Sequence, residues 1–109
     1  MNQLSAETRH GIEEALRCHG VCLATAMTHC LEMGGEHVKP QHFRLMMDCA
    51  AMCQLAADLM AHKSQFHRQS CAFCADICEV CARDCEHMEG MEDCAAACRS
   101  CAQSCRAMV

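Results

Sequence analysis

The segment CAFCADICEVCARDC, from Cys71 to Cys85, carries five cysteines separated by steps of three, four, three and four residues. Steps of three and four keep side chains on one face of an α-helix. The segment therefore predicts a helix with a continuous stripe of thiols: Cys71, Cys74, Cys78, Cys81 and Cys85. Three further stripes follow helical spacing: Cys18, Cys22 and Cys30; Cys49 and Cys53; Cys94, Cys98, Cys101 and Cys105.

The rest of the chain also predicts helices, because good helix formers dominate it and no alternating β-branched run indicates a strand. Glycine, proline and candidate caps delimit four expected helices: about 5–33 after the cap Ser5, about 40–62 from Pro40, about 64–88 after the cap Ser64, and about 91–109 after Gly90. Short loops make neighbouring helices antiparallel. The predicted fold is all-α, an antiparallel up-down-up-down four-helix bundle with a cysteine-lined interior, and we expect one domain over residues 1–109.

The cysteine content indicates where the protein works. Fourteen cysteines among 109 residues exceed what core filling explains, since leucine fills a helical seam better and does not oxidise. A disulfide scaffold would need export, and the charged start MNQLSAETRHGIEEALR has no apolar signal-peptide core. We therefore expect a cytoplasmic protein with reduced thiols. The net charge of −5 and the lack of a long apolar stretch argue against nucleic-acid and membrane partners.

The spacing of the thiols favours Cu(I). Twelve of the fourteen cysteines form C-x-x-x-C pairs, and only Cys30 and Cys71 stand outside them. Residues four apart on a helix have Cβ atoms about 5–6 Å apart, so two sulfurs can share one ion. Cu(I) accepts so few soft ligands, and one thiolate per Cu(I) leaves no net charge in an interior without Lys or Arg. We expect multiple Cu(I) ions, roughly one per cysteine, and release of thiol protons on loading.

Other thiol chemistries are weighed against copper. Zinc needs four ligands, and aligning the helices from their turns gives a single four-thiol layer of Cys22, Cys53, Cys78 and Cys101. The C-x2-C spacings follow helix periodicity rather than the ferredoxin run, which disfavours an iron–sulfur cluster. No triad, phosphate loop or paired seam carboxylates indicate an enzyme. The alternatives to copper storage are a thiol-disulfide redox protein and a zinc-thiolate reservoir.

Softer or borderline ligands continue the seams at the bundle ends. Thioethers bind Cu(I) weakly beside thiolates, so the methionine-rich end near Gly34 and Gly90 is a candidate copper entrance, with core filling as the alternative. We expect His10, His37 and His62 to be solvated surface residues. The candidate ligands at the ends are His29, His42, His67, Met33, Met46, Met88 and Met91.

The segments DCAAMC, CAFCADICEVCARDC and CAAACRSCAQSC, in this order on a four-helix pattern, resemble the four-helix-bundle copper storage proteins. The resemblance runs from about Ala15 to Met108 and is to the cytosolic branch. It implies a bacterial protein that stores Cu(I) on the fourteen cysteines, without catalysis, in a homotetramer of bundles. The partners that donate or accept copper stay unidentified. Because helices three and four carry more cysteines, we expect their half of the bundle to hold more copper.

Overall fold

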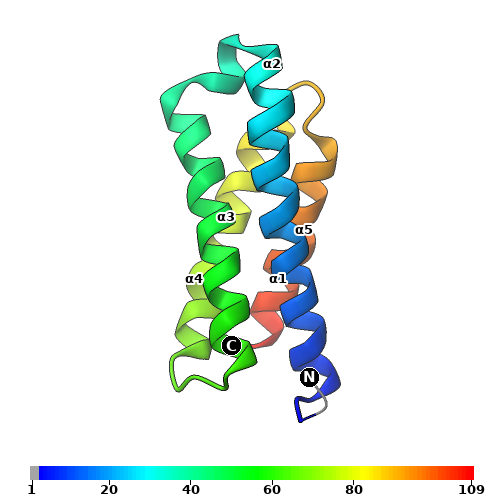
Figure 1. Cartoon of the computed structure of the whole chain (residues 1–109), viewed down its shortest axis with the longest axis vertical. Helices are drawn as coiled ribbons and strands as arrows, with labels where there is room; N and C mark the ends of the chain where they lie inside the picture. Colours follow the sequence, from blue (N-terminus) through cyan, green and yellow to red (C-terminus); the bar gives the residue numbers. More distant parts are fainter. Residues whose placement is uncertain (1–2) are drawn as a thin grey trace.

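The computed structural model describes residues 3–109, which form four helical rods joined by short turns (Figure 1). The rod from α1 packs against α3 and α5, and α4 packs against the same two helices, so the rods enclose one core. This arrangement, 45 × 21 × 17 Å, confirms the predicted up-down-up-down bundle. The elements in order are α1 (Ala6–Thr25), a π-helical turn (Ala26–Cys30), α2 (Leu31–Met33), a 3-10 turn (Gly35–Val38), α3 (Pro40–Ala61), α4 (His67–Glu86) and α5 (Glu92–Ala107).

Most helix ends lie where the local chemistry predicts. The Oγ of Ser5 accepts a hydrogen bond from the backbone N–H of Thr8 at 3.1 Å, which caps α1. Gly34 has φ of +65°, which ends α2, and Pro40 occupies the first turn of α3. The predicted cap of α4 was wrong: α4 begins at His67, and the Oγ of Ser64 accepts from the N–H of Phe66 within the preceding turn.

The first rod contains a π-helical turn that the sequence did not predict. Cys18, Cys22, Ala26 and Cys30 follow one another in steps of four, and each such step overshoots an α-helical turn by about 40°. A turn with i to i+5 hydrogen bonds holds more residues and offsets this drift. The π-helical turn of residues 26–30 therefore keeps Cys30 facing the interior, where it is 0% exposed.

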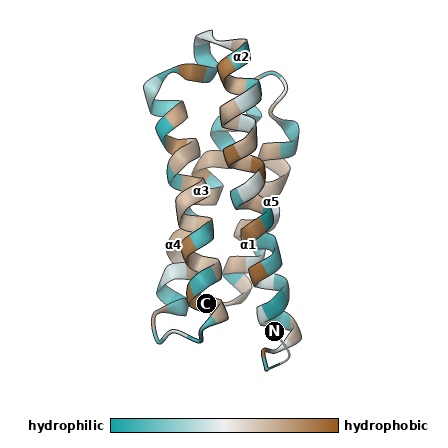
Figure 2. Cartoon of the chain, viewed as in Figure 1, coloured by the Kyte–Doolittle hydropathy of each residue, from teal (hydrophilic) through white to brown (hydrophobic). Residues whose placement is uncertain are grey.

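The core is built from small and soft side chains. Alanine, cysteine and methionine supply nearly all of its buried residues, with Ile12 among the few others. The outer face of α4 and α5 is charged instead: Arg99 pairs with Glu86, and Arg106 pairs with Asp76 and Glu79. Figure 2 shows hydrophobic and hydrophilic residues interleaved along every rod, as expected for helices with one buried face. Exposed ion pairs of this kind contribute little, so the core carries the fold.

No helix in the described part of the chain combines the length and the hydropathy that a bilayer-spanning segment needs.

Two glycines give a matched test of the fold. Gly90 has φ of +78°, and a Cβ there would lie 2.5 Å from the ring of His29. Gly20 lies inside α1 with nothing within 4 Å of such a Cβ. We predict that Gly90→Ala lowers the free energy of unfolding of the metal-free protein, whereas Gly20→Ala raises it by about 0.5–1 kcal/mol. Denaturant unfolding followed by circular dichroism under reducing conditions measures both, and an equal effect of the two changes would contradict the structure.

Candidate metal centre

Every cysteine of the chain points into the bundle. All fourteen are reduced and buried, with exposed fractions between 0 and 1%. They come from all four rods, because each stripe lies on the face that its rod turns toward the core. The structure therefore brings together the complete set of predicted thiol ligands.

The thiols form a continuous column rather than isolated pairs. The Sγ of Cys22 lies 3.4 Å from that of Cys94 and 3.5 Å from that of Cys98, which joins α1 to α5. The Sγ atoms of Cys53 and Cys78 are 3.6 Å apart and join α3 to α4. Cys49 links the two halves, since its Sγ lies 3.8 Å from both Cys78 and Cys98.

Four groups of four thiols have all their Sγ atoms within 4.8 Å of one another. The groups share members, so one cysteine can serve two of them. They are Cys18, Cys49, Cys53 and Cys78; Cys18, Cys22, Cys49 and Cys98; Cys22, Cys81, Cys94 and Cys98; and Cys53, Cys74, Cys78 and Cys101.

These groups correct the register expected from turn lengths. Cys53, Cys78 and Cys101 do gather, but their fourth member is Cys74 and not Cys22. Cys22 lies one helical turn further along, where its Sγ is 3.9 Å from that of Cys49. The estimate from turn lengths included neither the π-helical turn of residues 26–30 nor the 3-10 turn of residues 35–38.

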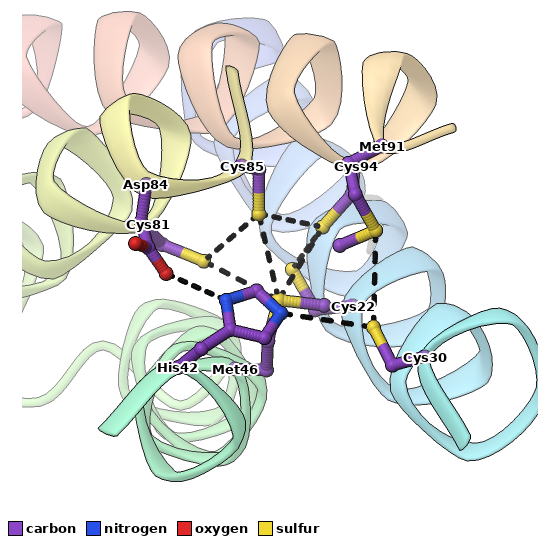
Figure 3. A network of polar contacts seen from close by, with 9 residues as sticks. All are labelled: Cys22, Cys30, His42, Met46, Cys81, Asp84, Cys85, Met91 and Cys94. Carbon is purple, nitrogen blue, oxygen red and sulfur yellow. Dashed lines mark hydrogen bonds and ion pairs between the residues drawn. The ribbon is translucent and has the colours of Figure 1, made fainter. Parts of the chain in front are cut away.

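At the end of the bundle near the 3-10 turn, other ligand types join the thiols (Figure 3). The Sδ of Met46, on α3, lies 3.6 to 3.8 Å from the Sγ atoms of Cys81, Cys85 and Cys94. Met46 is fully buried, so the thioether is as enclosed as the thiols around it.

Cys30 lies beside a second group of mixed candidate ligands. Its Sγ is 3.7 Å from Nε2 of His42 and 3.8 Å from Sδ of Met91, and both of these side chains are buried. The Nδ1–H of His42 donates to the Oδ2 of Asp84 at 2.6 Å. Figure 3 shows these residues converging from α3, α4, the π-helical turn and the segment before α5.

The remaining candidate ligands make other contacts. The ring of His29 bonds through Nε2 to the backbone oxygen of Glu89 at 3.0 Å, and His67 bonds through Nδ1 to the backbone oxygen of Ser64 at 2.8 Å. Met88 is partly buried against the core, and Met33 is 47% exposed.

His37 was expected at the surface and is instead buried. Its Nε2 bonds to the backbone oxygen of Glu89 at 2.9 Å, which fixes the loop before α5. Sequence reasoning also missed Asp84, to which it assigned no role. The signal was available, because Asp84 follows Cys81 by three residues and so borders the buried face.

The interior disfavours net charge. Among residues 3–109 the buried polar side chains are His37, His42 and Ser70, and no Lys or Arg is buried. Burial raises the pKa of the Cys30 thiol. The pKa of Cys98 also rises, because its neighbours Cys18 and Cys22 hydrogen-bond to the neutral thiol and because it is desolvated. Hydrogen bonds between thiols act the other way on some partners, such as Cys94, whose pKa falls to about 5, but desolvation opposes ionisation of both. Burial therefore disfavours a charged column.

Comparison with known proteins identifies the family to which this chain belongs. A family model described as "Copper storage protein" matches residues 4–109. The chain is similar to the Nmul_A1745 protein of Nitrosospira multiformis, with 44% identity, coverage of 99% of this chain and 96% of that one, and a TM-score of 0.92.

Two further solved structures are similar over nearly their whole length. One is Cu(I)-bound copper storage protein BsCsp3, with 36% identity, coverage of 94% and 97%, and a TM-score of 0.85. The other is apo copper storage protein 3 from Bacillus subtilis, with 37% identity, coverage of 93% and 97%, and a TM-score of 0.81. The bundle described here thus resembles both a metal-bound and a metal-free relative.

The raised pKa values predict a shifted thiol titration. In the unfolded chain, thiols ionise near an ordinary pKa of about 8.5. In the folded metal-free protein, Cys30 and Cys98 stay neutral to higher pH, so folding stability is fully present below about pH 8.5 and falls as the pH rises above it. We expect thiolate absorbance at pH 9.5 to be lower in the folded protein than in denaturant. Coinciding titration curves would contradict the burial of these thiols.

Proposed function

We propose that this chain, which belongs to the copper storage protein family, holds many Cu(I) ions on the fourteen cysteines inside its bundle. The observation that carries the proposal is the overlap of the four-thiol groups, which makes one connected column of sulfur atoms. Neighbouring sulfur atoms in the column lie 3.4 to 4.0 Å apart. One ion can bridge two sulfur atoms at this separation through two bonds of about 2.3 Å, if the length of a zinc–thiolate bond is taken as a guide.

Charge supports monovalent copper over zinc. A four-thiolate zinc site carries a net charge of about −2, and the interior of the described chain offers no buried Lys or Arg to offset it. One Cu(I) per thiolate is neutral, and each sulfur can bridge two ions. Because neighbouring four-thiol groups share cysteines, they also cannot all be separate tetrahedral zinc sites. The column therefore suits Cu(I) throughout.

Several finer properties belong to this proposal. The capacity approaches one Cu(I) per cysteine, the protein stores copper without catalysing a reaction, and residues 1–109 act as a single domain. Cys30, Cys71 and the other twelve cysteines all serve as ligands. We further propose a cytoplasmic location and a homotetramer of bundles, as the resemblance to the cytosolic branch implies. Proteins that deliver or collect the copper are still to be identified.

The bundle is folded before copper enters. Neutral thiols pack as small apolar side chains, so the core does not need the metal to form. Similarity to the apo form of copper storage protein 3 from Bacillus subtilis supports this. Copper then stabilises the fold further, because it binds the native state.

Anaerobic titration with Cu(I), in competition with a strong chelator, tests the storage function. We predict retention of roughly one Cu(I) per cysteine, with about one proton released per ion, because only the thiolate binds. Thiol counting with a chromogenic reagent in denaturant should find all fourteen cysteines reduced before loading. A capacity near a quarter of that number with zinc preferred would favour a zinc reservoir, and reversible disulfides with little metal would favour a redox protein.

The methionine-rich end is our proposed copper entrance, and Met46 tests it. Its Sδ contacts three thiols, so it can pass an incoming ion to them. We predict that Met46→Leu, which keeps the apolar volume, slows Cu(I) loading and leaves the final capacity unchanged. Stopped-flow transfer from a chelator measures the rate. The matched control is Met27→Leu on the exposed face of the first rod, which should load normally; lower capacity with an unchanged rate for Met46→Leu would argue for a storage ligand instead.

A further inference from the structure

Cys30 differs from the other cysteines in its surroundings. It lies outside the C-x-x-x-C pairs, and its hydrogen-bond contacts within the described residues are with His42 and Met91 rather than with another thiol. It also belongs to none of the four-thiol groups. Its position therefore offers a different donor set: one thiolate, one imidazole nitrogen and one thioether.

The hydrogen bond to Asp84 determines which ring nitrogen of His42 carries the proton and which offers a lone pair to Cys30. An ionised carboxylate can only accept hydrogen bonds, so the contact of 2.6 Å from Asp84 requires the proton of a neutral His42 to sit on Nδ1. The lone pair is then on Nε2, which lies 3.7 Å from the Sγ of Cys30. A carboxylate behind a ligating imidazole fixes the tautomer and the ring orientation in this way.

The distances suit a soft monovalent ion. An ion bound by sulfur at about 2.3 Å and by imidazole nitrogen at about 2.0 Å can bridge atoms that lie up to about 4.3 Å apart. The contacts of Cys30 with Nε2 of His42 at 3.7 Å and with Sδ of Met91 at 3.8 Å fall below that limit. With one thiolate and two neutral donors, such a site is neutral when it holds Cu(I).

We propose that Asp84 is a positioning residue that, through His42, completes a mixed imidazole, thiolate and thioether site for Cu(I) with Cys30 and Met91. The site is chemically separate from the thiol column, and the proposal rests on the copper storage proposed above. Asp84 itself stands at the edge of the core with a side chain 35% exposed, while the side chain of His42 is 3% exposed. The carboxylate therefore links a solvated surface to a buried ligand.

Nitrogen-15 NMR of the histidine rings tests the positioning role directly, because Cu(I) is diamagnetic. In the metal-free wild-type protein, we expect the His42 proton on Nδ1 and an unprotonated Nε2. On loading with Cu(I) alone, the Nε2 resonance of His42 should shift, while that of the exposed His10 should stay unchanged. A proton on Nε2 in the metal-free protein, or an unmoved Nε2 at full loading, would overturn the proposal.

Variants of Asp84 separate positioning from a merely structural contact between α3 and α4. In Asp84→Ala, we expect both tautomers of His42 to be populated and one Cu(I) equivalent to pass to a competing chelator about 10-fold more readily. The other equivalents should be retained as in the wild type. Asp84→Asn keeps an oxygen acceptor, so its effect should be intermediate, and it provides the readout should the alanine variant unfold.

Glu86→Gln is the matched control, since Glu86 is an exposed carboxylate on the same helix that pairs with Arg99 instead of a histidine. It should leave the tautomer of His42 and all copper equivalents unchanged. Wild-type retention by Asp84→Ala, or weakening of every equivalent together, would refute the positioning role. A wild-type protein that retains no copper would refute the storage function itself. A wild-type protein that fills completely while the Nε2 resonance of His42 does not shift would refute only this site.

Discussion

The structure depends on keeping a thiol-filled interior free of net charge. The fourteen cysteines are buried at 0 to 1% exposure, and in the described chain no buried Lys or Arg could balance thiolates. Without metal, burial disfavours thiolates in this interior, because an uncompensated buried charge costs several kcal/mol. With metal, each lost proton must be replaced by one positive charge. A monovalent soft ion keeps the interior neutral at any degree of filling, because each ion replaces one thiol proton. A divalent ion keeps it neutral only when it replaces two protons, that is, when two thiolates and no more bind it.

The same constraint explains the unusual core. Leucine or isoleucine would give a tighter seam, but each would interrupt the column of sulfur atoms. Alanine takes the remaining close-packed positions, such as Ala15 and Ala26, and leaves room for the neighbouring sulfurs. Methionine fills the larger gaps at the ends with a flexible side chain that still carries sulfur. The rods are thus held by many small contacts of polarizable atoms.

Helical periodicity made the fold and the thiol lining predictable from the sequence, since steps of three and four residues fix one face of each rod. What depends on tertiary geometry was not predictable. The π-helical turn that keeps Cys30 inside, and the one-turn offset of Cys22, arise from how the first rod meets the 3-10 turn. His37 appeared to be a solvated loop residue because its partner, the backbone oxygen of Glu89, lies far away in the sequence. Asp84 was missed because its partner, His42, arrives from α3, far away in the sequence.

The three histidines at this end of the bundle make two kinds of contact: two bind the loop before α5, and one lies beside a thiol. Those at 29 and 37 both bond to the backbone oxygen of Glu89, at 3.0 and 2.9 Å, and their rings lie edge to face with centroids 5.2 Å apart. These contacts hold the chain just before Gly90, and that segment carries Met91 toward Cys30. His42 is different, because its Nδ1 is held by a carboxylate and its Nε2 meets sulfur. Two imidazoles therefore fix the loop that brings a thioether to Cys30, and the third presents a nitrogen beside the same thiol, so side chains other than cysteine set the geometry around Cys30 at this end.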